Sequence, residues 1–278
     1  MSSHLFPAGL YPILDLDACQ NANRRPEDLA LNWAARAWMP YQLRAKTLDA
    51  SGYAALAERL HSARSRLPGP HHPRIIANDF LEVAWHHSHW FCGIHLGQHD
   101  LHELRPRDAE MLHQIRQSGG VCGCSTHNAD QFLAAFNEMR GGLHRWSYVA
   151  LGPVFPTRSK TNSTDQNEVL NIEETLRILQ KASSSKSDSP GNAEDLPTIV
   201  LIGSMDAGRW MALQEAWRKT RDSRALRLSV VPAAIASVHS EDGCQAWTEC
   251  LIKDAEGPGF RQSKASRVHE ESSPSVPS

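Results

Sequence analysis

Short apolar runs rich in β-branched residues recur along the chain, and segments with the apolar spacing of helices lie between them. Eight runs predict strands, at Leu10–Leu16, Met39–Ala45, Arg74–Asp79, Phe91–Gly97, Val121–His127, Trp146–Phe155, Thr198–Ser204 and Leu226–Ala233. The clearest helical patterns cover Tyr53–Arg66, Asp130–Met139, Ile172–Lys181 and Ala207–Arg218. Strand and helix that alternate eight times are typical of a parallel sheet with crossover helices.

Eight repeats in about 250 residues favour an α/β fold of the (β/α)8 type, a TIM barrel, in one domain that we expect to span residues 1–255. A doubly wound open sheet is the alternative. Residues 182–197 (ASSSKSDSPGNAEDLP) are rich in serine, charge and turn formers, so we expect a flexible insert loop there. Residues 256–278 have the composition of a disordered tail.

Composition narrows the class of protein. The 278 residues are 41% hydrophobic and 22% charged, which is ordinary for a globular protein, and the net charge of −2 gives no reason to expect a nucleic-acid or membrane partner. No apolar run approaches about 18 residues, so no membrane span is expected. The first residues, MSSHLFP, lack the basic start and apolar core of a secretion signal, so we expect a cytoplasmic protein.

Cysteines and histidines raise the question of a metal site. The six cysteines are too few and too scattered for a disulfide framework. Cys122 and Cys124 share one face of a strand, but no second Cys/His pair at zinc spacing accompanies them, so we expect packed, reduced thiols. We expect His86, His87 and His89 at a solvated helix end rather than on a metal.

Polar residues occur where the predicted strands end, which in a barrel is where chemistry gathers. Gln42, Arg44 and Lys46 are spaced by two and therefore share one face. Such a row facing the barrel interior is costly unless it binds an anion or another polar ligand. An ion-pair network is the alternative, although no matching acidic row is close in the sequence.

The third and fourth strands end in carboxylates. Asp79 follows Asn78, and Asp100 follows Gln98 and His99. Two carboxylates on neighbouring strand ends can hold Mg²⁺, which keeps several waters and bridges to phosphate oxygens. Helix capping would explain each aspartate singly.

The fifth strand ends in Ser125-Thr126-His127, and the sixth leads into ALGPVFPTRSKT at residues 150–161. Gly152-Pro153 would shape the path into a loop that carries hydroxyls and cations at Thr157, Ser159 and Lys160. Together with Arg44, Lys46 and the two aspartates, these residues predict a site for a polyanion and a divalent metal. For His127, packing and proton handling both stay open.

Taken in order, QLRAK, NDF, GIHLGQHDL, GCSTH, ALGPVFPTRSK and IGSM resemble the thiamine-phosphate synthase family, over about residues 10–236. The resemblance implies a TIM barrel that joins a pyrimidine pyrophosphate to a thiazole phosphate, with release of pyrophosphate. It implies Mg²⁺ on Asp79 and Asp100, and a pyrimidine-pyrophosphate site at Gln42, Arg44, Lys46, Asn78, Ser125 and Lys160. It implies thiazole-phosphate contacts at Thr157, Ser159, Gly203 and Ser204.

If cleavage of the carbon–oxygen bond precedes attack, as the resemblance implies, the enzyme must mainly stabilise the departing negative charge. We therefore expect Arg44, Lys46, Ser125 and Lys160 to carry catalysis. Two departures from the family concern the thiazole phosphate. A Gly-Gly pair is replaced by Gly203-Ser204, and a Val-Ser pair by Pro232-Ala233. We predict weaker affinity for that substrate.

Two other functions stay open. A thiazole tautomerase on the same barrel typically lacks both the GQxD aspartate and the PTxSK loop, and both are present here. A degenerate barrel that binds a thiamine precursor without catalysis is the second. The expected partners are the two small substrates, with neither nucleic acid nor membrane, and self-association into a homo-oligomer is left open.

Overall fold

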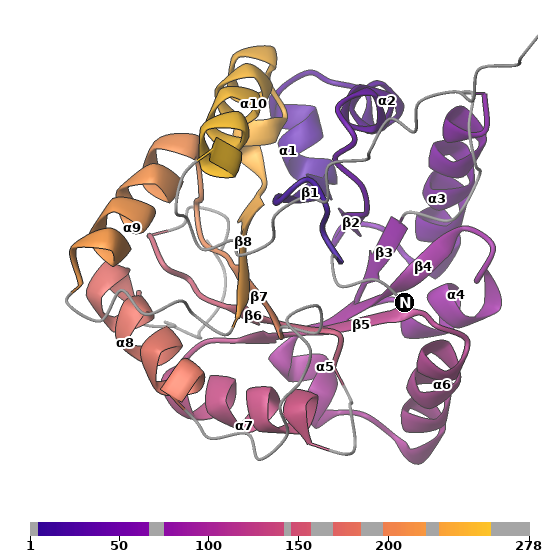
Figure 1. The fold of residues 1–278 in the computed structure, drawn as a ribbon. Helices are drawn as coiled ribbons and strands as arrows, with labels where there is room; N and C mark the ends of the chain where they lie inside the picture. Colours follow the sequence, from indigo (N-terminus) through magenta and orange to yellow (C-terminus); the bar gives the residue numbers. More distant parts are fainter. Residues whose placement is uncertain are drawn as a thin grey trace, which may run out of the picture.

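The eight strands form one closed parallel barrel in chain order (Figure 1). The structure is a computed structural model that describes residues 5–66, 75–141, 146–156, 169–184, 197–220 and 228–256. The strands are β1 (Tyr11–Asp15), β2 (Tyr41–Arg44), β3 (Ile75–Asn78), β4 (Phe91–Leu96), β5 (Val121–Thr126), β6 (Tyr148–Leu151), β7 (Thr198–Leu201) and β8 (Ser229–Ala234). Pairing of β1 with β8, with Tyr11 opposite Ala233, closes the ring. The TIM-barrel prediction is confirmed, and the open-sheet alternative is wrong.

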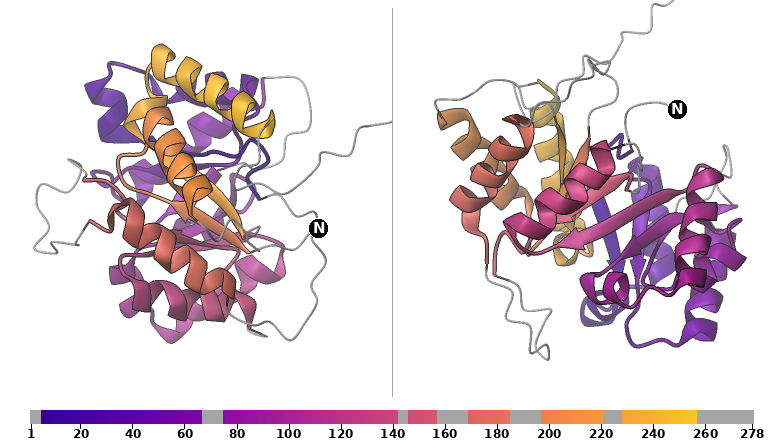
Figure 2. Two further views of the ribbon diagram at one scale, coloured as in Figure 1. Left: turned by 60° about the vertical axis from the view of Figure 1, so that its left-hand side comes forward. Right: turned by 90° about the horizontal axis from the view of Figure 1, so that it is seen from below.

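Helices surround the strands. They are α1 (Leu16–Asn21), α2 (Pro26–Ala35), α3 (Ala50–Arg64), α4 (Leu81–His86), α5 (Gln98–His102), α6 (Pro106–Gln117), α7 (Ala129–Arg140), α8 (Asn171–Ser184), α9 (Ala207–Lys219), the 3-10 turn η1 (Ala236–Val238) and α10 (Glu241–Glu256). The last three helices, α8, α9 and α10, lie side by side along one flank of the barrel (Figure 2). No helix in the described ranges is both long enough and apolar enough to cross a membrane.

Two predicted boundaries need correction. Helix α8 continues to Ser184, so residues 182–184 of the predicted insert loop are helical, and residues 185–196 lie outside the described part of the chain. Helix α10 includes Glu256, the first residue of the predicted tail, and residues 257–278 also lie outside it. The apolar face of α8 continues past residue 181, since Ala182 is 1% exposed, and burial here outweighs local propensity.

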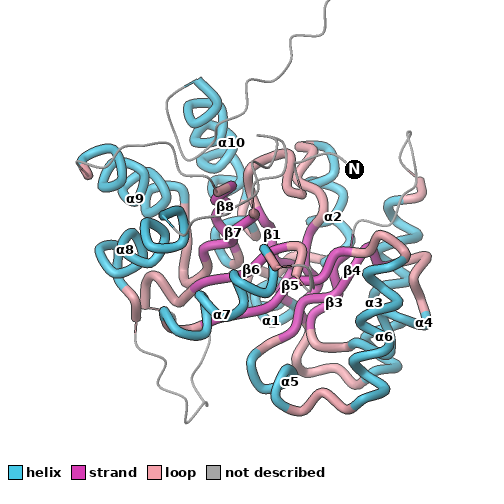
Figure 3. Tube along the Cα trace, turned by 60° about the horizontal axis from the view of Figure 1, so that its bottom comes forward, coloured by secondary structure: helices cyan, strands magenta, loops and turns pink. Residues whose placement is uncertain are grey.

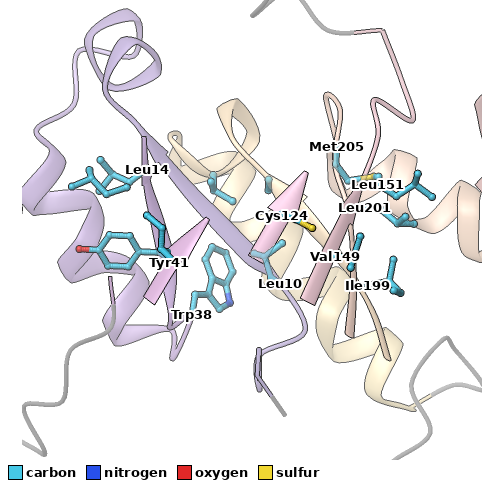
Figure 4. Close-up of a cluster of buried hydrophobic side chains, with 14 of the residues drawn as sticks. Leu10, Leu14, Trp38, Tyr41, Cys124, Val149, Leu151, Ile199, Leu201 and Met205 are labelled. Atoms are coloured by element: carbon cyan, nitrogen blue, oxygen red, sulfur yellow. The ribbon is translucent and has the colours of Figure 1, made fainter. Parts of the chain in front are cut away.

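Side chains of alternate strand residues point to opposite sides of the barrel wall. Those on the outer side pack beneath the helices, and Figure 4 shows part of this layer, including Leu14, Tyr41, Val149 and Leu201. Cys124 belongs to the same layer. The six cysteines, all of them in described segments, form no disulfide and five are buried, as the sequence predicts.

The inner side chains fill the barrel, which the tube view shows as a ring of strands inside the helices (Figure 3). They form a second buried cluster of Phe6, Tyr11, Ile13, Ile76, Tyr148, Ala150, Val200, Val231 and Ala233. Gly123 lies opposite Tyr148 across the β5–β6 ladder, and a Cβ on Gly123 would be 2.0 Å from the Tyr148 ring. Glycine at position 123 therefore makes room for a tyrosine ring inside the barrel.

This close approach predicts the effect of Gly123→Ala. The added methyl group must displace the Tyr148 ring, and overpacking of this kind costs about 1–3 kcal/mol. We expect urea denaturation to give a free energy of unfolding lower by that amount. Gly208→Ala in α9 is the matched control, because its Cβ meets nothing closer than Asp206 Oδ1 at 3.4 Å. Equal stability of the two variants would contradict the packing argument.

Candidate active site

Polar side chains meet at the rim of the barrel formed by the carboxyl ends of the strands. In the strand ladders, Asp15 of β1 pairs with Arg44 of β2, and Asn78 of β3 pairs with His95 of β4. Ser125 lies two residues beyond Gly123 on the inner face of β5. Because all strands are parallel, their carboxyl ends share this rim, where active sites of TIM barrels are found.

Two carboxylates converge on one backbone N–H at this rim. The Gly97 N–H donates to Asp79 Oδ1 at 3.3 Å and to Asp100 Oδ2 at 3.2 Å. Asp79 has a positive φ of 67° and donates its own N–H to the His95 carbonyl at 3.0 Å, which turns its side chain toward Gly97. A side chain on Gly97 would collide with the Asp100 carboxylate, since a Cβ there would lie 2.9 Å from Oδ2. The sequence prediction that both aspartates stand on one rim is confirmed.

Burial and a neighbouring carboxylate both act on Asp79. Burial, and then the neighbouring Asp100, raise the pKa of Asp79 to about 6, and Lys46 offsets part of the effect. The described residues contain no group of three or more His, Cys, Asp or Glu side chains able to hold a metal. Two carboxylates on one rim are a donor set that suits a hard cation, which would complete its coordination with water and phosphate oxygens. Asp100 also caps α5, so the capping explanation accounts for one role of this residue.

Arg44 lies half-buried on the inner face and forms an ion pair with Asp15. The row of Gln42, Arg44 and Lys46 therefore does have an acidic partner, which comes from β1 rather than from the local sequence. Asp15 also accepts the Ala18 N–H at 2.9 Å at the start of α1. Strand β2 ends at Arg44, so Lys46 lies beyond it and is exposed. The prediction that all three side chains share one strand face is correct for Gln42 and Arg44 only.

Gln42 and Asn78 line the site as buried amides. Gln42 is 2% exposed, and its Nε2 has no partner in hydrogen-bond geometry among the residues that the structure describes. Asn78 donates its side-chain amide to Asp79 Oδ2. Its backbone N–H donates to the Tyr53 hydroxyl at 2.9 Å, and that hydroxyl donates to the Leu43 carbonyl at 2.7 Å. A tyrosine of α3 thus fixes the ends of β2 and β3 against each other.

The fifth strand places Ser125 at the rim, with its Oγ 2.8 Å from His95 Nε2. Gln98 donates its side-chain amide to the Ser125 carbonyl. His127 Nδ1 lies 2.8 Å from the Gly152 carbonyl, a contact that links the ends of β5 and β6. Asp15, His95 and Gln98 were not among the predicted site residues. A histidine within a buried strand, two residues before Gly97, was the signal available for His95.

The seventh strand leads into a strained turn. Gly203 has φ +118° and Ser204 has φ +43°, so a serine occupies the left-handed region that favours glycine. The Ser204 carbonyl accepts from Arg209 Nη1 at 2.5 Å, and the Arg209 guanidinium lies 5.1 Å from the centre of the Phe155 ring. Pro232 is buried in β8 opposite Leu201. The predicted residues Thr157, Ser159 and Lys160 lie outside the described residues.

The histidine cluster lies apart from this rim. His86 ends α4 and is exposed, as expected for a solvated helix end, and the His87 ring stacks on Trp90 at 4.3 Å between centroids. These contacts agree with the prediction of a surface role.

The carboxylate pair predicts the behaviour of Asp79→Asn, a replacement that tolerates positive φ. The pKa of Asp79 is raised in the folded protein, so ionisation of this group costs stability above about pH 6. In EDTA at pH 8 we expect a higher Tm for the variant than for the natural sequence. At pH 5 the difference should shrink, because Asp79 is then already protonated.

Thermal unfolding followed by circular dichroism at both pH values measures this effect. Addition of MgCl2 at pH 8 should raise the Tm of the natural sequence and leave that of Asp79→Asn unchanged. Glu110→Gln, which changes an exposed carboxylate in the middle of α6, is the control. A lower Tm for Asp79→Asn at pH 8 would refute the repulsion.

Comparisons with known proteins bear on the family and the fold of this chain. The profile of the thiamine monophosphate synthase family matches residues 10–208. A thiamine-phosphate synthase of Klebsiella pneumoniae is 31% identical over 55% of this chain and 66% of its own length. One of Yersinia pestis is 28% identical over 70% of this chain and 71% of its own length. A thiamine phosphate pyrophosphorylase from Pyrococcus furiosus has the same fold, with a TM-score of 0.55 at 17% identity over 88% of this chain and 93% of its own. The chain belongs to the thiamine monophosphate synthase family.

Proposed function

We propose that this chain is a thiamine-phosphate synthase, a transferase of thiamine biosynthesis. It joins hydroxymethylpyrimidine pyrophosphate to thiazole phosphate and releases pyrophosphate. The observation that carries the proposal is the convergence of Asp79 and Asp100 on the Gly97 N–H, with Lys46 close enough to act on Asp79. The proposed partners are the two small substrates, and we propose a cytoplasmic location because this family acts in biosynthesis.

Asp79 and Asp100 would hold Mg²⁺, which neutralises part of the pyrophosphate charge when bound. The chain itself supplies the remaining stabilisation. Arg44 is oriented by Asp15, so its guanidinium is placed before the substrate arrives and little reorganisation is needed. Lys46 is close enough to lower the pKa of Asp79 and adds a second positive charge. Lys160 and Ser125 are proposed to contact the same pyrophosphate.

The pyrimidine end of the substrate needs hydrogen bonds in a dry environment. Gln42 and Asn78 are buried amides on the inner face, and Gln42 Nε2 has a proton that no described group accepts in good geometry. An unsatisfied buried donor costs free energy, which a bound pyrimidine would recover. We therefore propose that these two amides orient the ring, so that its methylene carbon faces the thiazole nitrogen.

Negative charge develops on the leaving pyrophosphate, and the attacking thiazole nitrogen already carries its lone pair. The main task is thus to stabilise the leaving group rather than to activate the nucleophile. Two features support this division: Lys46 is close enough to Asp79 to lower its pKa, and Arg44 is held by Asp15 at the end of β2. Phosphate of the thiazole partner is proposed to bind near Gly203 and Ser204, with help from Thr157 and Ser159.

An assay with both precursors and MgCl2 tests the proposal, with the formation of thiamine phosphate measured by chromatography. We expect activity that EDTA abolishes and that Asp100→Ala lowers at least about 100-fold, because one charged metal ligand is lost. Glu110→Ala is the matched control. Conversion of the thiazole alone would favour a tautomerase. Binding of pyrimidine pyrophosphate without product would favour a non-catalytic barrel.

The Gly203-Ser204 turn predicts a weakened thiazole-phosphate site. Ser204→Gly restores a residue suited to φ +43° and bares the backbone. We expect the KM for thiazole phosphate to fall about 3- to 10-fold, as for one regained hydrogen bond, with the KM for the pyrimidine substrate unchanged. Steady-state kinetics with each substrate varied in turn measures both constants. An unchanged KM for thiazole phosphate would show that the serine does not weaken this site.

A further inference from the structure

Four side chains from four strands form a continuous hydrogen-bonded chain beneath the rim. The Tyr11 and Tyr148 hydroxyls are 2.7 Å apart, and the Tyr148 hydroxyl is 2.8 Å from His95 Nδ1. His95 Nε2 is in turn 2.8 Å from Ser125 Oγ. Tyr11, Tyr148 and His95 are at most 4% exposed, whereas Ser125 is half-buried at the rim. This chain of hydrogen bonds therefore leads from the barrel interior to a residue of the proposed site.

Packing leaves these groups little freedom. The His95 and Tyr148 rings are stacked, with centroids 5.6 Å apart and planes 16° apart. Gly123 of β5 pairs with His95 on one side and with Tyr148 on the other. Phe6 packs against both tyrosine rings, at 4.5 Å from Tyr11 and 5.5 Å from Tyr148. Each ring is thus held on more than one side, and the hydrogen bonds are set by packing.

Burial also fixes the protonation of the members. His95 is 4% exposed and its two ring nitrogens face hydroxyl groups, so a positive charge on it would be buried without a counter-ion. Burial also raises the pKa of both tyrosines well above the usual value of 10. All three groups are therefore neutral at physiological pH. A neutral imidazole donates through one nitrogen and accepts through the other, so the bonds on its two sides must run in the same direction.

The two ends decide between the two directions. In the opposite direction, the Ser125 hydroxyl would donate its proton to His95 Nε2. Only the lone pairs of Ser125 Oγ would then face an incoming polyanion. At the other end, the Gln42 amide lies next to the Tyr11 hydroxyl, and among the described residues its Nε2 has no other acceptor in good geometry. An amide nitrogen can donate to Tyr11 but cannot accept from it. Both ends favour bonds that run from Tyr11 toward Ser125.

We propose that Tyr11, Tyr148 and His95 are positioning residues that make the Ser125 hydroxyl a donor to the departing pyrophosphate. Tyr11 donates to Tyr148, Tyr148 donates to His95 Nδ1, and the Nε2–H of His95 donates to Ser125 Oγ. The Ser125 proton is then free to point at the anion before it binds, which is the preorganisation that stabilises a leaving group. This inference rests on the proposed function for the identity of the anion.

Tyr148→Phe tests the chain, since it removes two hydrogen bonds and keeps the ring. We expect kcat to fall about 10-fold, the effect of one misdirected hydrogen bond to charge, with the KM for thiazole phosphate within about twofold. In a Ser125→Ala background the same change should lower kcat less than about twofold, because the group it positions is gone. Equal losses in both backgrounds would overturn the proposal in favour of a general structural defect.

Tyr41→Phe is the matched control. Tyr41 is equally buried, but it belongs to the outer layer beneath the helices (Figure 4). We expect its kcat to equal that of the natural sequence. A loss as large as that of Tyr148→Phe would show that removal of any buried hydroxyl is harmful.

Two readouts are independent of turnover. Nitrogen-15 NMR of histidine-labelled protein, with His95 assigned from the spectrum of His95→Gln, should show the Nε2–H tautomer, and the Nδ1–H tautomer would refute the direction. Calorimetry with MgCl2 and inorganic pyrophosphate should show weaker binding to Tyr148→Phe and to Ser125→Ala by similar factors. Unchanged pyrophosphate affinity in Tyr148→Phe would refute the role of the chain, whether or not the protein forms thiamine phosphate.

Discussion

Closure of the parallel sheet is the constraint on which the rest of this protein depends. Pairing of β1 with β8 joins segments more than 200 residues apart, and it brings the carboxyl ends of all eight strands to one rim. The same closure makes the interior narrow. Where a tyrosine enters it from β6, the neighbouring strand must carry glycine at position 123. The site and the packing beneath it are thus two consequences of one geometry.

Charge at the rim is balanced in pairs that the fold creates. Asp15 neutralises Arg44 across the β1–β2 ladder, whereas Asp79 and Asp100 repel each other across the loops after β3 and β4. One pair is satisfied without a ligand, and the other is not. The fold therefore keeps two carboxylates together at a cost in free energy.

The two halves of the site differ in how well they follow the family pattern. The half formed by β2 to β5 is built from residues that match the family motifs and that converge in the structure. The half near β7 and β8 has a serine at a left-handed φ and a buried proline in the last strand. Arg209 packs over Phe155 beside that turn. A cation is therefore present next to Gly203-Ser204, the pair that replaces the Gly-Gly of the family.

The sequence alone was enough to predict the barrel, because alternation of strand and helix is a local property written in hydrophobic spacing. It also placed Asp79, Asp100 and Ser125 at strand ends, since those positions follow directly from where apolar runs stop. It could not predict that Asp15 pairs with Arg44, or that Tyr11, Tyr148, His95 and Ser125 form one hydrogen-bonded chain. These contacts join residues 29 to 137 positions apart, and only the register and closure of the barrel bring them within hydrogen-bond distance.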